Sequence, residues 1–206
     1  MDKSENQKKE IDMKRLSALM LLVVLALPLA AGAMVEPKTG FDYPDQITVH
    51  ETATLNATGV GIREKTFLKV DVYTIVSYVM EGTDLGDNPG EFLINFDGAK
   101  KLQMDLCRGF SKAKLIGAFA DVIDANYKDQ SAFADDMATF FAYFTRDAEK
   151  NDVIEFMYCP KNKLVTTVNG EELGTIDNFE FVKALWSVWF AEKPASKDLK
   201  NSLIGK

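Results

Sequence analysis

The sequence is poor in the residues that most enzymes use for nucleophilic or metal chemistry. Among 206 residues there are one histidine and two cysteines, so the usual pairs of nucleophile and base have almost no members here. These few side chains also form no recognisable metal-ligand pattern. The G-x-S-x-G, H-E-x-x-H, G-x-x-x-x-G-K and C-x-x-C motifs are absent as well. We therefore expect no catalytic residues of these types, no metal and no cofactor.

The chain also has fewer basic than acidic residues. The chain has 24 Lys and Arg against 31 Asp and Glu, which gives a formal net charge of −7. An acidic surface repels phosphate backbones, so we expect no binding to nucleic acid. The length and a hydrophobic content of 47% are enough to bury one sizeable core, which predicts a folded chain with one main domain.

One long uncharged run lies close to the N-terminus. Lys14 and Arg15 precede the run, which has the sequence LSALMLLVVLALPLAAGAMV and includes Pro28 and the small triplet ending at Ala33. A basic start, an apolar stretch and small residues before a cleavage point are typical of a secretory signal peptide. We predict that residues 1–33 are this peptide, that cleavage follows Ala33, and that the protein is periplasmic or secreted.

The same run admits a second interpretation as a membrane anchor, because it is long enough to span a bilayer once. Pro28 and the small triplet favour cleavage, after which no stable membrane span is expected. No cysteine follows the run to carry a lipid. Met13 is a possible true start, since the first twelve residues add nothing to the signal.

Strand patterns dominate the first half of the mature chain. Residues 34–45 read as a linker, and the domain is expected to occupy residues 46–206. Gly59 and Gly61 indicate a bulge or a close backbone approach. Alternating or β-branched residues predict strands over 46–55 and 66–80, and a hairpin turned at Asp97-Gly98 with arms 92–96 and 101–107.

Helical periodicity follows, and strands then return. Ser111 is placed to cap a helix over 112–127, and Asp177 or Asn178 to cap a last long helix that ends before Pro194. The other predicted elements are a helix over 131–150 and strands over 153–159, 163–168 and 171–176, with a tight turn at Asn169-Gly170. This order predicts an α+β fold, in which a layer of helices packs on one face of an antiparallel sheet.

The two cysteines, Cys107 and Cys159, fall at the ends of predicted strands. They can form a disulfide in an oxidising compartment. The alternative is that both are small, half-buried apolar side chains without a covalent bond.

Two segments carry a resemblance to a known family. Residues 58–82 (TGVGIREKTFLKVDVYTIVSYVMEG) are similar to the first core hairpin of the chalcone isomerase-like family, and residues 165–205 resemble its Asn-Gly hairpin, Trp-containing helix and closing tail. The resemblance extends over roughly residues 46–205. The family includes plant chalcone isomerases, plastid fatty-acid-binding proteins and bacterial relatives, and this chain looks like an exported bacterial member. The resemblance implies an open-faced sandwich of sheet and helices.

Chalcone isomerases use an arginine in a G-x-G-x-R context, which Arg63 matches. They also use a hydroxyl on the next strand, and a tyrosine and an asparagine on the following helix. Those two helix positions fall on Phe110 and Gly117, or on Ser111 for the tyrosine if the register moves by one residue. Without these donors a water and a ketone oxygen are not positioned for ring closure. The resemblance therefore argues against chalcone isomerase activity.

The fatty-acid-binding branch matches more closely, through Arg63-Glu64-Lys65 and the strand Val70-Asp71-Val72-Tyr73. The resemblance implies that Arg63 and Tyr73 hold a ligand carboxylate at the mouth of an apolar pocket, where a guanidinium fork and a phenol suit that group. Thr74 is a further candidate for a ligand-binding hydroxyl.

Other roles for these residues stay open at this point. Arg63 can instead be a surface residue paired with an acid such as Asp71, and Tyr73 a tyrosine at the edge of the core. Arg108, just after a strand, is expected to be structural or solvated.

The function predicted from the sequence is thus non-catalytic binding of a fatty acid or a similar apolar carboxylate by an exported protein. One alternative is an isomerase or lyase acting on an unknown apolar substrate, with Arg63 facing an oxyanion. Another is a scaffold without a ligand, which a pocket filled by side chains such as Phe140, Phe144 or Trp189 would favour.

Overall fold

The computed structural model describes residues 32–49, 53–65, 69–160 and 163–205. The predicted signal peptide falls outside these ranges except for its last two residues. None of the helices in the described part of the chain is long and apolar enough to cross a membrane.

The described residues form strands first, then helices and strands in turn. The strands are β1 (Ala33–Val35), β2 (Asp42–Pro44), β3 (Gln46–Val49), β4 (Ala53–Lys65), β5 (Val70–Met80), β6 (Lys100–Leu106), β7 (Val153–Cys159), β8 (Lys163–Val168) and β9 (Glu171–Ile176). The helices are α2 (Pro89–Asn95), α3 (Lys112–Asn126), α4 (Ala134–Tyr143), α5 (Phe179–Phe190) and α6 (Lys197–Leu203).

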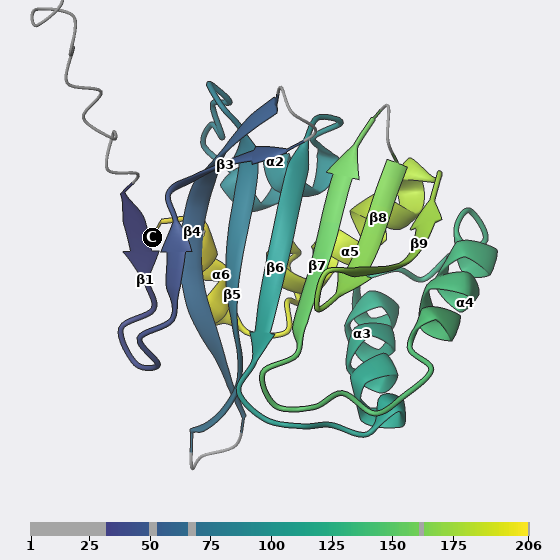
Figure 1. Cartoon of the computed structure of the whole chain (residues 1–206). Helices are drawn as coiled ribbons and strands as arrows, with labels where there is room; N and C mark the ends of the chain where they lie inside the picture. The colour runs from purple at the N-terminus through teal and green to yellow at the C-terminus, as the bar shows by residue number, and fades with distance from the viewer. Residues whose placement is uncertain (1–31, 50–52, 66–68, 161–162, 206) are drawn as a thin grey trace, which may run out of the picture. The chain divides into compact units, whose positions relative to one another are not determined.

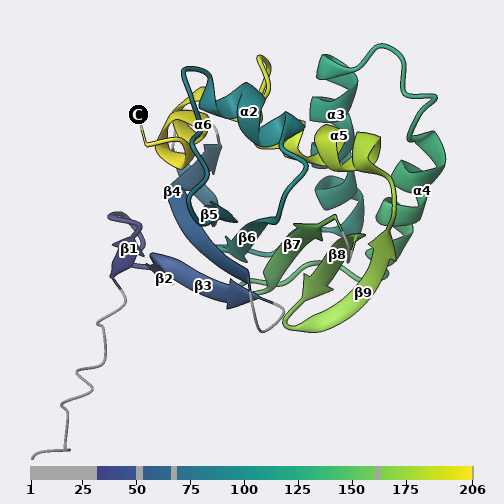
Figure 2. The ribbon, with the colours of Figure 1, turned by 90° about the horizontal axis from the view of Figure 1, so that it is seen from above.

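Seven of the described strands form one antiparallel sheet in the order β3-β4-β5-β6-β7-β8-β9, so each strand pairs with its neighbour in sequence. The sheet curls, and the helices lie inside the curl on one face (Figures 1 and 2). This arrangement confirms the predicted α+β class.

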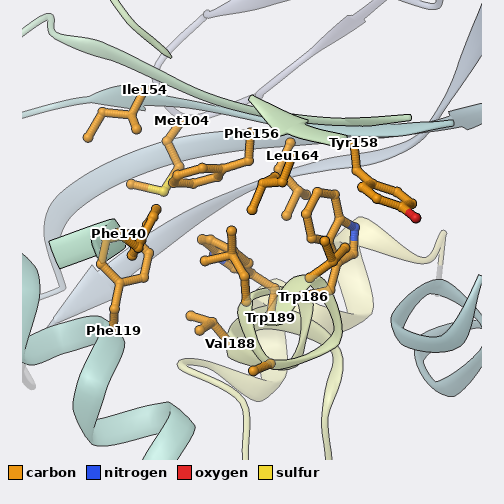
Figure 3. Packing of buried hydrophobic residues seen from close by; sticks show 14 of the residues in the cluster. Met104, Phe119, Phe140, Ile154, Phe156, Tyr158, Leu164, Trp186, Val188 and Trp189 are labelled. Atoms are coloured by element: carbon orange, nitrogen blue, oxygen red, sulfur yellow. The ribbon is translucent and has the colours of Figure 1, made fainter. Parts of the chain in front are cut away.

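The alternation along the central strands gives the sheet two apolar faces. In β5, Ile75 and Val79 belong to the main core under the helices, whereas Val76 and Tyr78 belong to a smaller cluster on the other face. Figure 3 shows the main core, in which side chains of the sheet such as Phe156 lie against those of α5.

The segment 34–45 is not the plain linker that we expected. It holds β2 and most of β1, which pair with each other, and Tyr43 is only 2% exposed. The Tyr43 hydroxyl lies 2.5 Å from the hydroxyl of Thr74 and donates to the carboxylate of Asp105 at 2.8 Å. A tyrosine with apolar and polar partners attaches the segment to the helix-free face of the sheet.

The predicted strand 92–96 is wrong, because most of it belongs to helix α2. The Asn88 side chain accepts from the backbone N–H of Glu91, and Pro89 occupies the first turn. An asparagine cap followed by proline starts a helix, and this signal outweighs the apolar run of Phe92 and Leu93.

Two further boundaries differ from the prediction. The strand expected over 46–55 is two antiparallel strands, with Val49 opposite Ala53. The helix expected over 131–150 ends at Tyr143, because the backbone of Ala148 instead exchanges hydrogen bonds with that of Phe110. Most of the strand predicted over 66–80 is confirmed as β5, and residues 66–68 lie outside the described residues.

Other local predictions are confirmed. Ser111 and Asn178 cap α3 and α5. Asn169 and Gly170 both have positive φ, 54° and 79°, which is the backbone of a type I′ hairpin turn.

Candidate functional site

Arg63 and Tyr73 lie directly opposite each other on the paired strands β4 and β5. A bulge follows Arg63, so that Glu64 pairs with Asp71 and Val72 is left over. Bulges redirect side chains, and here Val72 and Tyr73 both line the same cavity as Arg63. The sheet therefore brings together the two residues that the resemblance implied.

The cavity lies between the sheet and helices α3 and α5, with a volume of about 700 Å³. This is within the usual range for small-molecule sites. Its inner wall is apolar and comes from β6, α3 and α5, through Met104, Leu106, Leu115, Phe119, Val188 and Trp189.

Tyr73 is held in place by Trp189, whose indole N–H donates to the tyrosine hydroxyl at 3.0 Å. Burial raises the pKa of Tyr73 to about 12, although the Trp189 hydrogen bond and the Arg63 charge act in the opposite direction. The phenol therefore keeps its proton near neutral pH. Because its oxygen accepts from Trp189, the O–H remains a donor for a ligand.

Arg63 has no carboxylate partner among the described residues. One of its guanidinium nitrogens donates to the backbone carbonyl of Glu64. The ion pair with Asp71 considered above is not formed, because Lys38 pairs with both Asp71 and Glu64. These contacts raise the pKa of Lys38 above its ordinary value, and they leave the Arg63 guanidinium available to an anion in the cavity.

Three further cations surround the cavity, namely Lys65, Arg108 and Lys114, and all three are exposed. Among the described residues that line the cavity, Asp121 is the single acid. A cluster of cations at the cavity of a chain with net charge −7 creates a local potential that attracts anions.

Phe110 and Gly117 both line the cavity, at the positions where the resemblance would require a tyrosine and an asparagine. An added Cβ at Gly117 would meet nothing within 4 Å. Ser111 lines the cavity as well, but its hydroxyl accepts from the backbone N–H of Lys114 as the cap of α3. Neither Gly117 in α3 nor Phe110 before it therefore offers a polar side chain to the cavity.

Thr74 does not belong to this site. It is fully buried, and its hydroxyl bonds Tyr43 on the opposite face of the sheet. The alternation of a strand explains this placement, because adjacent residues such as Tyr73 and Thr74 point to opposite faces.

The predicted disulfide candidate is also wrong. Both Cys107 and Cys159 are free. Lys100, at the start of β6, pairs with Tyr158 next to Cys159, whereas Cys107 follows the far end of β6. At ~3.3 Å per residue the two cysteines are roughly 26 Å apart along the strands, and a disulfide needs Cα atoms within about 7 Å.

The sequence did not identify three features of this site. Trp189 was considered only as a side chain that could fill the pocket, although its indole N–H positions Tyr73. Arg108 was expected to be structural or solvated, and it is exposed, but it also lines the cavity. Lys38 lies in a segment that was predicted to be a linker, and its ion pairs with Glu64 and Asp71 were not predicted. Each of these roles depends on contacts between elements that are distant in sequence.

Comparison with known proteins bears on the family and the fold of the chain. A family model described as chalcone isomerase-like matches residues 36–205. A search of curated proteins found no match. A solved structure with a similar fold is an Arabidopsis thaliana protein named as a fatty-acid binding protein. Its TM-score is 0.68 at 20% identity, over 84% of this chain and 96% of that chain.

Proposed function

The chain belongs to the chalcone isomerase-like family, and we propose that it binds a fatty acid or a similar apolar carboxylate without catalysing a reaction on it. One observation carries the proposal. Arg63 and Tyr73 lie side by side in an open apolar cavity, and no described carboxylate competes for the guanidinium. The name of the Arabidopsis structural neighbour supports the same ligand class.

The two ends of such a ligand make different contributions. A hydrogen bond to a charged group contributes about 1.5–3 kcal/mol, so Arg63 and Tyr73 together discriminate carboxylates from neutral groups. Each buried methylene contributes about 0.8 kcal/mol, so a tail of ten methylenes contributes roughly 8 kcal/mol. The apolar wall therefore supplies most of the affinity, and the polar pair supplies the selectivity.

Binding without catalysis is favoured by two residues that line the cavity, Gly117 in α3 and Phe110 just before that helix. Phe110 and Gly117 offer no side-chain donor or acceptor to position a water or a ketone oxygen. Chalcone turnover by the purified protein should be undetectable, and measurable turnover would contradict this part of the proposal.

A ligand-free scaffold is less consistent with the packing of the aromatic side chains. Phe140 and Phe144 lie in the main core and do not line this cavity. Trp189 lines it, but with Tyr73 as its hydrogen-bond partner it forms part of the wall, and about 700 Å³ stays open.

Export is a second part of the proposal, and it rests on the signal-like run before Met34. Cleavage after Ala33 would remove the first pair of the β1–β2 ladder and leave the pairs of Met34 and Val35. The N-terminal sequence of protein purified from its native host should begin at Met34. Material that retains residues 1–33 would contradict export by cleavage.

The binding proposal is tested by extracting lipid from the protein purified without added ligand. Mass spectrometry should find free fatty acid in the native protein and little in the Arg63→Ala variant. Lys163→Ala is the matched control, since Lys163 pairs with Asp177 at the surface and does not line the cavity. Absence of any bound acid, together with no saturable binding of added fatty acids, would overturn the proposal.

A further inference from the structure

A second cavity of about 310 Å³ lies on the helix-bearing side of the sheet, next to the first. Ile154 of β7, Val168 of β8 and Leu173 after the turn into β9 line it. Leu115 of α3 lines both cavities. It is 7% exposed, so its side chain fills the space where the two cavities approach each other.

The wall between the cavities is thin. Three directly interacting pairs of residues form it together with Leu115, and in each pair one member lines the first cavity and the other lines the second. They are the backbone bridge Phe110–Ala148, the ring stack Phe119–Phe144 with centroids 6.2 Å apart, and the cross-strand pair Met104–Ile154.

The two cavities follow one another across the strands. The Arg63–Tyr73 pair lies on β4 and β5, and the first cavity reaches Met104 on β6. The second cavity starts at Ile154 on β7 and continues to β9. Because neighbouring strands are about 4.8 Å apart, the wall lies roughly 14 Å from β4, and the second cavity extends about 10 Å further.

The geometry points to Leu115 as the residue that sets the length of the apolar tail that the protein accepts. This inference rests on the proposed function. A carboxylate held by Arg63 and Tyr73 directs its tail across the strands, and the tail ends against Leu115. The second cavity is the continuation of the path, apolar at the wall through Phe144 and Ile154, with the Arg146–Asp152 ion pair also in its lining.

The test is a titration of saturated fatty acids of increasing length against the native protein, Leu115→Ala and Leu115→Val. In the native protein affinity should increase about fourfold per added methylene until the tail reaches Leu115, and then stop increasing. In Leu115→Ala the increase should continue over several more methylenes, so that the longest acids bind at least tenfold more tightly than to the native protein.

Leu164→Ala is the matched control, because Leu164 is fully buried and lines neither cavity. It should keep the native length limit. A folded Leu115→Ala variant with the native length limit would overturn the inference while leaving fatty-acid binding intact. If that variant does not fold, Leu115→Val decides in the same way, with a shift of about one methylene expected. A native protein that binds no fatty acid of any length would instead overturn the proposed function.

Discussion

At the scale of single residues, recognition of a carboxylate depends on how Tyr73 is held. The Trp189 indole and the phenol form a hydrogen bond inside the wall of the cavity, which fixes the hydroxyl next to Arg63 on the neighbouring strand. A donor whose orientation is fixed before binding loses less entropy when the ligand arrives. Tyr73 therefore acts as an oriented donor.

Replacing Tyr73 by Phe removes the hydroxyl and keeps the ring. Loss of one hydrogen bond to a charged group, about 1.5–3 kcal/mol, should weaken fatty-acid binding by roughly 10- to 100-fold in calorimetric titration. Tyr158→Phe is the control, since its hydroxyl bonds Asp97 and its side chain lines neither cavity. Equal affinities for Tyr73→Phe and the native protein would show that the phenol does not contact the ligand.

A second residue of interest is Lys100, whose side chain is fully buried. Its ammonium group donates to the backbone carbonyls of Leu93 at 2.8 Å and Ile94 at 3.2 Å, at the C-terminal end of that helix. Three aromatic rings surround it, those of Tyr158, Phe179 and Trp186. Burial lowers the pKa of Lys100 to about 7.

This lowered pKa predicts a pH dependence of stability. Between pH 7 and about 10 the unfolded chain keeps the Lys100 proton and the folded chain loses it, so the free energy of unfolding should increase with pH in this window. The slope approaches ~1 kcal/mol per pH unit. Urea unfolding at pH 7, 8 and 9 should show this increase in the native protein and in Lys101→Met, but not in Lys100→Met. Parallel pH profiles for all three proteins would contradict it.

At the scale of elements, helix α6 lies directly against β4. A Cβ placed on Gly59 would lie 2.1 Å from the backbone oxygen of Ser202 in α6, so only glycine permits this contact. Gly117 is the opposite case, because it lies within α3 and faces open space. The same substitution should therefore have opposite effects at the two positions.

Gly59→Ala should lower the free energy of unfolding by roughly 1–3 kcal/mol, the usual cost of overpacking. Gly117→Ala should raise it by up to about 1 kcal/mol, because alanine favours a helix over glycine. Urea denaturation of both variants and the native protein measures the difference. A neutral Gly59→Ala variant would indicate that α6 does not rest on β4 in solution.

At the scale of the whole molecule, the antiparallel pairing of β6 with β7 holds Cys107 and Cys159 at opposite ends of neighbouring strands. The fold therefore depends on its cores and on no cross-link between these two residues. Reducing agent should leave the thermal midpoint unchanged, and mass spectrometry of the oxidised protein should find both thiols alkylatable. A midpoint that falls on reduction would contradict this separation.

The parts of the fold that the sequence predicted are those determined by local patterns. The alternation of β5 and the Asn169-Gly170 turn depend only on neighbouring residues, and the structure confirms both. The pairing of Trp189 with Tyr73 joins positions 116 residues apart, and no local pattern encodes it. Thr74 was wrongly predicted to share the ligand site with its neighbour Tyr73. A strand sends adjacent side chains to opposite faces, so the two residues cannot both face the cavity.

The central claim is that Arg63 in this cavity recognises a carboxylate on an apolar tail. The most direct test is a calorimetric titration of one saturated fatty acid and its methyl ester against the native protein, Arg63→Met and the surface control Lys163→Met. The native protein and the control should prefer the acid by roughly 10- to 100-fold. Arg63→Met should lose most of this preference, because the Tyr73 phenol then remains as the donor to the carboxylate. A native protein without preference, or an Arg63→Met variant that keeps the native preference in full, would contradict the claim.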